Sequence, residues 1–207
     1  MKKRKKELKT WKKVSEFYEV PLNIIKGVLD KQSINFYYLK KILEKEKISL
    51  EKVIKEIKCK NSRKRIKVVW RMTKELARFL GYLISEGSSL KSSNQIRFPC
   101  SSKEMIKDFV KISRKLFNVK AKVLKYKRNC YDVIIYSKAL QKYLEIVFGF
   151  YKGINAENKK VPYQILTSSN IVVSNFLSSL IDGDGYISKD KICLEYTTKS
   201  RELANSI

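Results

Sequence analysis

Two acidic residues, Glu86 and Asp184, occupy the same position in two related segments that lie 98 residues apart. Each follows an apolar stretch with helical spacing, so each is expected at the C-terminal end of a helix. If these helices pack in parallel, the two carboxylates meet where both helix dipoles are negative. Two carboxylates this close raise each other's pKa unless a cation lies between them, and Mg2+ suits the site because this ion accepts few protein oxygens and keeps its waters. The spacing therefore predicts a divalent-metal site.

The chain contains no histidine. This excludes serine–histidine–aspartate and cysteine–histidine catalysis, histidine general bases, and zinc sites that need imidazole ligands. No C-x-x-C pair occurs among the four cysteines, so free thiols are expected and a zinc knuckle is not. Any hydrolysis is therefore expected to use carboxylates, lysines and a hard metal ion held by oxygen.

The charge balance points to a polyanionic partner. Lys and Arg number 46 against 20 Asp and Glu, which gives a net charge of +26, while 43% of the residues are hydrophobic and can form a core. A fold with this charge repels itself unless it binds a polyanion, so nucleic acid is expected ahead of an anionic membrane surface. No stretch approaches the ~18 apolar residues of a membrane span, and no signal peptide follows the basic start. We expect a cytoplasmic protein.

An internal repeat organises the C-terminal part of the chain. Residues 77–109 and 175–207 align without a gap, and apolar, acidic and glycine positions match although only four of the 33 aligned residues are identical. The first helix is predicted over 74–86, capped by Thr73, and the second over 171–182, ended by Gly183 and Gly185.

Small residues stand four apart on both predicted helices. They are Gly81 and Ser85 on the first helix and Ser179 and Gly183 on the second. Pairs of this kind let two helices approach backbone to backbone, so the two helices are expected to pack against each other.

The remaining pattern predicts short strands and helices. In the first copy we expect a hairpin with its second strand over 95–98, a helix over 102–117, strands over 119–126 and 131–136, and a helix over 138–147. In the second copy we expect a hairpin over 186–197 and a helix capped by Ser200.

These motifs resemble those of one family. LSSLIDGDG, at 177–185, closely matches the LAGLIDADG signature, and FLGYLISEG, at 79–87, matches it more loosely. Over about residues 73–207 the chain resembles the two-motif LAGLIDADG (DOD-type) homing endonuclease family. The resemblance implies an α+β fold of αββαββα repeats, in which the motif helices form the interface and the strands form a saddle over double-stranded DNA. It also implies site-specific, metal-dependent cleavage of DNA.

The resemblance also assigns site residues. The last acid of each motif, Glu86 and Asp184, would be catalytic and would bind Mg2+ or another divalent cation. Ser85 and Gly183 would offer backbone carbonyls to the metal. Basic residues that position water vary in this family, and the candidates here are Lys125, Lys127 and Lys199. The predicted DNA contacts from the strand face are Lys91, Arg97, Lys120, Lys122, Lys125, Lys127, Arg128 and Lys189.

The first 57 residues are predicted to form a separate all-α domain with four short helices. Residues 14–29 resemble a helix-turn-helix of the phage-repressor type, whose second helix enters the major groove. A helical bundle without base contacts is the alternative. Residues 58–72 form a basic linker that suits a phosphate-tracking arm.

The second repeat is expected to be incomplete. The first repeat covers residues 73–170, and residues 171–207 provide only the start of the second, without its second strand pair. A fragment, a decayed gene, or a second chain that completes the repeat would each explain this. Weak or absent cleavage is therefore expected from this chain. A non-cleaving DNA-binding regulator and an intron RNA maturase on the same scaffold are the alternative functions.

Overall fold

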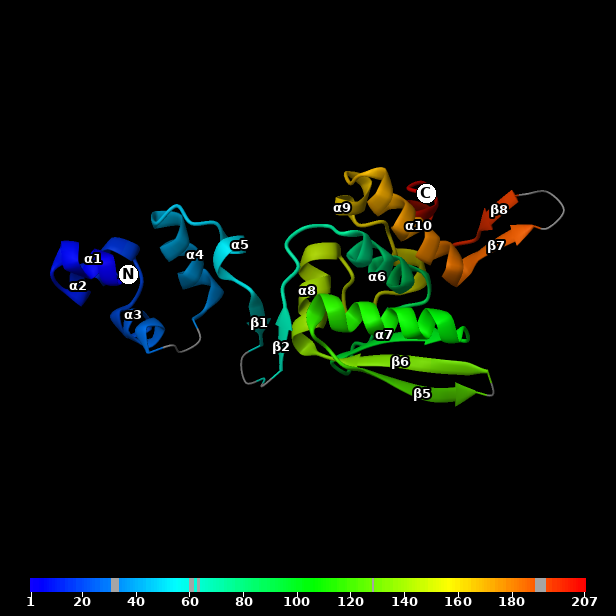
Figure 1. Cartoon of the computed structure of the whole chain (residues 1–207), viewed down its shortest axis with the longest axis horizontal. Coiled ribbons are helices and arrows are strands. Elements are labelled where there is room, and N and C mark those ends of the chain that lie inside the picture. The colour runs from blue at the N-terminus through cyan, green and yellow to red at the C-terminus, as the bar shows by residue number, and fades with distance from the viewer. Residues whose placement is uncertain (31–33, 60–61, 63, 128, 189–192) are drawn as a thin grey trace. The chain divides into compact units, whose positions relative to one another are not determined.

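The computed structural model describes residues 1–30, 34–59, 62, 64–127, 129–188 and 193–207 (Figure 1). The chain divides into two compact units, Met1–Lys55 and Glu56–Ile207. Among the described residues, no helix combines the length and the apolar character needed to cross a membrane.

The first unit is helical. Its helices are α1 (Lys2–Leu8), α2 (Trp11–Tyr18), α3 (Leu22–Leu29), α4 (Phe36–Lys45) and α5 (Leu50–Val53). The described residues of this unit thus hold five helices where the sequence predicted four, because Lys9 adopts a φ of 66° and ends α1. Thr10 then starts α2, since its side chain accepts a hydrogen bond from the Lys13 amide. Val14, Tyr18 and Ile25 are fully buried in the core of this unit.

A tight turn joins α2 to α3. Glu19 ends α2 with a φ of 53°, in the left-handed region, and its amide donates to the carbonyls of Ser15 and Glu16. This conformation costs a residue other than glycine about 1 kcal/mol. The Glu19 carboxylate lies 3.3 Å from the Lys41 ammonium and 3.1 Å from the Lys45 ammonium. Two ion pairs with α4 therefore stabilise the turn.

Part of the segment predicted to be helix and linker forms a strand pair. β1 (Glu56–Lys58) pairs antiparallel with β2 (Arg65–Lys67), and Ile57 stands opposite Ile66. The prediction that the first 57 residues are all helical is therefore wrong at residues 56 and 57, which belong to β1. Ile66 is only 1% exposed, which shows that burial of an apolar side chain favours the strand pair at this point.

The first repeat has the predicted αββαββα order. Its elements are α6 (Lys74–Ser85), β3 (Ser88–Ser89), β4 (Gln95–Cys100), α7 (Lys103–Phe117), β5 (Ala121–Lys127), β6 (Cys130–Tyr136) and α8 (Lys138–Phe148). The strands form an antiparallel sheet in the order β3-β4-β6-β5, so β5 is an edge strand. The Thr73 side chain caps α6 by accepting from the Leu76 amide, as predicted. The α+β fold class is confirmed.

The helices cover one face of this sheet (Figure 1). Phe98 of β4 stacks on Phe109 of α7 with ring centroids 4.7 Å apart, and Val133 and Ile135 of β6 are fully buried. Because side chains alternate along a strand, the residues between these positions lie on the opposite face, which the helices leave open. Arg97 of β4 belongs to this open face.

The second repeat is shorter. A 3-10 turn, η1 (Ala156–Asn158), and α9 (Tyr163–Leu166) lead into α10 (Asn170–Asp184), which is followed by β7 (Gly185–Ser188), β8 (Cys193–Tyr196) and α11 (Arg201–Ala204). The prediction that Gly183 breaks the helix is wrong, because α10 continues through it and ends at Asp184. β7 and β8 pair with each other, and no third strand joins them within the described ranges. Their apolar side chains are largely exposed, as Ile187 (66%) and Leu194 (52%) show.

Candidate functional site

The two motif helices, α6 and α10, pack side by side at glycine. A Cβ atom built on Gly81 would lie 2.0 Å from Ser179 Oγ, and one built on Gly183 would lie 2.2 Å from Ser85 Oγ. The first contact joins Gly81 to Ser179, and the second joins the residues four positions later on each helix. The helices are therefore parallel, and their C-terminal ends meet. The structure thus has the predicted close packing of the α6 and α10 backbones.

Glu86 and Asp184 meet at this end. Glu86 caps α6, Asp184 is the last residue of α10, and the two carboxyl groups lie close enough for Asp184 to act on the pKa of Glu86. Burial of the carboxyl, followed by the neighbouring Asp184 charge, raises the pKa of Glu86 to about 7. The helix C-termini add negative potential at the same place. The Glu86 carboxyl is therefore more easily protonated than an ordinary glutamate when no metal cation is present, as expected for a cation site.

A buried lysine that the sequence did not suggest lies beside the pair. Lys159 is 9% exposed, and its Nζ donates to the Ser85 carbonyl at 2.5 Å. Burial lowers the pKa of Lys159, while the nearby Asp184 and Glu86 act in the opposite direction. The Ser200 hydroxyl, which also caps α11, donates to the Lys159 carbonyl at 2.6 Å. The second repeat thus holds this lysine in place.

Tyr196 of β8 completes the surroundings of the pair. Its hydroxyl is partly buried, and this burial, followed by the charges of Asp184 and Glu86, raises the pKa of Tyr196. Gly185, the residue after Asp184, stands opposite Tyr196 in the β7–β8 register. The neutral phenol is therefore fixed close to the carboxylates by the strand pair.

The donor set suits a hard metal ion with few protein ligands. Glu86 and Asp184 supply carboxylate oxygens, and the Gly183 backbone abuts Ser85 and the Glu86 side chain. The predicted Ser85 carbonyl already accepts the hydrogen bond from Lys159. No cluster of three or more His, Cys, Asp or Glu side chains occurs in the described parts of the chain. A cation at this pair would therefore keep waters in its shell, as Mg2+ does.

An arginine cross-links the two motif helices. Arg78 of α6 pairs with Asp108 of α7 at 2.5 Å and lies 3.5 Å from Asp182 of α10. Its guanidinium also donates to the hydroxyl of Tyr82, which in turn donates to Asp108. One cation on α6, about two turns before Glu86, thus contacts acidic side chains of both α7 and α10.

Two of the predicted DNA contacts share the open face of the sheet. Arg97 and Lys122 stand opposite the same residue of β6, Ile134. Arg97 forms an ion pair with Asp132, which fixes the guanidinium on this face. The Lys122 ammonium lies 5.6 Å from the centre of the Tyr136 ring. Both cations are therefore held at defined positions on a face without helices.

The other predicted basic residues are more scattered. Lys125 stands opposite Tyr131, which puts it on the helix-covered side, so it does not share the face of Arg97. The stem of Lys91 lies against Gly153, Lys120 is exposed just before β5, Lys127 is the last residue of β5, and Lys199 is exposed. Arg128 and Lys189 lie outside the described residues.

Known proteins match this architecture in sequence. A family model described as a LAGLIDADG-like domain matches residues 73–147 and 172–207. One component of the A-type ATP synthase of Pyrococcus abyssi is 31% identical over 155 residues, which are 74% of this chain and 15% of that protein. The replication factor C small subunit of Methanocaldococcus jannaschii is 32% identical over 134 residues, 64% of this chain and 7% of that protein.

The chain therefore spans only a small part of these relatives, whose names state unrelated activities. A solved structure of mesophilic variants of the homing endonuclease I-DmoI aligns with 55% of this chain and 58% of its own, at 17% identity and a TM-score of 0.38. The family match covers more than half of the 207 residues and includes both motif helices. The chain thus belongs to the LAGLIDADG-like domain family, the family of the homing endonucleases that its two motifs resemble.

Proposed function

We propose that the chain binds double-stranded DNA and cuts it at a specific site, with Mg2+ or another divalent cation held by Glu86 and Asp184. The observation that carries this proposal is the meeting of two carboxyl groups at the ends of two parallel helices, next to a buried lysine. A protein that only binds DNA has no need for an arrangement in which two acidic side chains meet at the ends of two packed helices.

The residues of the pair would act through charge. A divalent cation bound there supplies Lewis-acid stabilisation of a phosphoryl oxygen and a more acidic water. Glu86 and Asp184 supply the negative charge that holds such a cation, and Gly183 lets their helices come close enough. Lys159 holds the Ser85 carbonyl and offsets part of the repulsion between the acids, so we assign it as a positioning residue.

The open face of the sheet would hold the DNA. Arg97 and Lys122 lie on it at fixed positions, and Leu124 and Tyr136 expose apolar surface beside them. Cations at defined positions contact phosphates or the acceptor edges of guanine in the major groove. The net charge of +26 would attract the duplex before these contacts form.

The first unit would provide a second DNA-binding surface for the same duplex. α2, the Glu19 turn and α3 have the order of a helix-turn-helix, and α3 exposes Asn23 and Lys26, which are able to contact bases or phosphates. Two tethered DNA-binding units raise the effective concentration of DNA at each other. We therefore assign the first unit to affinity and the second unit to cleavage.

The test compares acid-to-amide variants on DNA from the gene's own locus, carried on a supercoiled plasmid with Mg2+. Glu86→Gln and Asp184→Asn should each abolish nicking while DNA binding is kept, because the open face is unchanged. Glu195→Gln is the matched control, since it removes one exposed acid from β8 without touching the pair. Loss of nicking in this control, or nicking that survives both pair variants, would refute the proposal.

A non-cleaving DNA-binding regulator is the second candidate, and one observation favours it. The β7–β8 hairpin that follows Asp184 has no further strand in the described residues, and its apolar side chains are exposed. An isolated two-stranded hairpin is marginally stable in water. If it does not hold the second acid firmly, a misplacement of ~1 Å costs about 100-fold in rate. Duplex binding with no nicking at any Mg2+ concentration would establish this function instead.

A further inference from the structure

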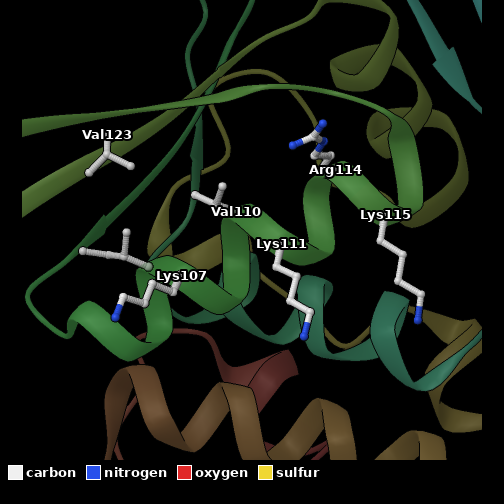
Figure 2. A pocket seen from close by; sticks show the side chains of 7 residues that line it. Lys107, Val110, Lys111, Arg114, Lys115 and Val123 are labelled. Carbon is white, nitrogen blue, oxygen red and sulfur yellow. The ribbon is translucent and has the colours of Figure 1, made fainter.

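A groove runs between α7 and the edge strand β5. Its volume is about 600 Å3, and its lining consists of Ile106, Lys107, Val110, Lys111, Arg114, Lys115 and Val123. Figure 2 shows Lys107, Lys111 and Lys115 projecting from successive turns of α7. The lining thus combines aliphatic side chains with four cations and contains no acid.

Most of this positive charge is not neutralised within the protein. Lys115 pairs with Glu75 at 2.6 Å. Among the described residues, no acid lies within ion-pair distance of Lys107, Lys111 or Arg114. Like charges three or four residues apart on a helix repel each other and destabilise it. Such a row is therefore favourable where an external polyanion neutralises it.

The groove does not belong to the open sheet face. Val123 pairs with Val133 and lies on the side covered by α7, whereas its neighbour Leu124 points to the open face. The two side chains are 45% and 47% exposed. DNA on the open face and a ligand in the groove would thus lie on opposite sides of β5.

We propose that this groove binds the phosphate backbone of a DNA duplex, at a site separate from the open face. The inference rests on the proposed function, since it assumes that the chain binds DNA. Lysines on successive helical turns are ~6 Å apart, and one strand of a duplex presents a phosphate every ~3.4 Å along its axis, so a row of lysines is able to contact several phosphates of one backbone. The lining has no aromatic ring on which unpaired bases would stack, so a duplex backbone fits it better than a single strand.

Two photocrosslinking reporters on neighbouring residues test the proposal. In the full chain, p-benzoylphenylalanine replaces Val123 in one protein and Leu124 in the other. Each protein is irradiated with a short end-labelled duplex of arbitrary sequence, in buffer without divalent metal so that no strand is cut. The two reporters share a strand and a similar exposure, so they differ chiefly in the face that they sample. Both are expected to capture the duplex.

Charge removal then separates the two faces. Lys107→Gln, Lys111→Gln and Arg114→Gln together should lower capture at residue 123 by ~10-fold and leave capture at 124 unchanged, because the phosphate contacts are lost only in the groove. Arg97→Gln with Lys122→Gln should have the reverse effect. The far-ultraviolet circular dichroism of each protein should match that of the unsubstituted chain, since the three groove cations are exposed.

The outcomes distinguish this inference from the proposed function. Capture at 124 but not at 123, or capture at 123 that resists removal of the three groove cations, would overturn the groove site alone. The same holds if the reporter at 123 captures only protein, which would indicate an acidic polypeptide in the groove. Failure of both reporters to capture any duplex would instead refute the proposed binding of DNA by the second unit.

Discussion

Ser85 and Gly183 stand at equivalent positions of the two repeats and lie in direct contact, so that a Cβ atom on the glycine would be 2.6 Å from the serine Cβ. Gly81 and Ser179 form the other contact of this kind. Each contact thus pairs one glycine with one serine of the same repeat position, with the glycine on α6 in one contact and on α10 in the other. The space between the helices admits one side chain per contact but not two.

Gly183→Ala should therefore destabilise the chain by about 1–3 kcal/mol, as expected when a methyl group is forced into a filled contact. At an unobstructed helix position the same substitution stabilises by up to about 1 kcal/mol. The sign of the change in unfolding free energy therefore shows whether the contact is filled. The measurement is the free energy of unfolding from urea denaturation.

Exchanging the two residues is the matched control for this effect. Ser85→Gly combined with Gly183→Ser keeps one side chain in the contact and should recover most of the lost stability. If the alanine variant is as stable as the unsubstituted chain, the helices do not pack as closely as the structure indicates.

Arg78→Met should destabilise the second unit by about 1.5–3 kcal/mol, because it leaves the Asp108 carboxylate with one partner fewer in a partly buried site. Asp182→Asn removes only the longer, 3.5 Å contact of the same arginine and should cost much less. Thermal unfolding of the two variants side by side checks this order. Equal losses of melting temperature would mean that the contact of Arg78 with Asp182 of α10, and not its contact with Asp108 of α7, provides most of the stabilisation.

The sequence predicted the motif helices and the meeting of their acids because both depend on local pattern and on a repeated spacing. It did not predict Lys159, because that lysine reaches the pair from a segment without repeat counterpart and is placed by the hydrogen bond from Ser200. The face of Lys125 also could not be predicted, since one residue of register decides it. Gly183 was expected to end α10 because glycine breaks helices in isolation, whereas contact with α6 requires it inside the helix.

Without metal, the chain should become less stable as the pH rises from 5 to 8. A carboxyl group with a higher pKa in the folded than in the unfolded chain stabilises the fold while it is protonated. For Glu86 this contribution is complete below the ordinary value of 4.5 and is lost as the pH rises through about 7. The chain has no histidine, so few other groups change charge in this range. Melting temperatures in chelator-containing buffers measure the effect.

Glu86→Gln is the control for this pH dependence. The amide is neutral throughout, so the melting temperature of this variant should be nearly constant between pH 5 and 8. A variant that keeps the full pH dependence of the unsubstituted chain would assign the effect to another group.

DNA binding by the full chain should weaken steeply with salt. If about six or more phosphates are contacted, the logarithm of the association constant should fall against the logarithm of the salt concentration with a slope of about −5 or steeper. Arg97→Gln with Lys122→Gln should make this slope shallower by about 2. Fluorescence anisotropy of a labelled duplex at several salt concentrations gives both slopes, and binding that does not respond to salt would contradict the assigned role of the basic residues.

Lys159→Met should shift the pH-dependent loss of stability to a higher pH. Methionine has nearly the same length but no charge, and the Lys159 ammonium is the cation that lowers the pKa of Glu86 against the effects of burial and Asp184. Its removal also leaves the Ser85 carbonyl without its lysine donor. Lys199→Met is the matched control, because this lysine is exposed and lies next to Ser200, the residue that holds Lys159. Its melting profile should follow that of the unsubstituted chain. If the two variants share one midpoint, Lys159 does not act on the carboxylate pair, and its burial serves only the packing of the second repeat.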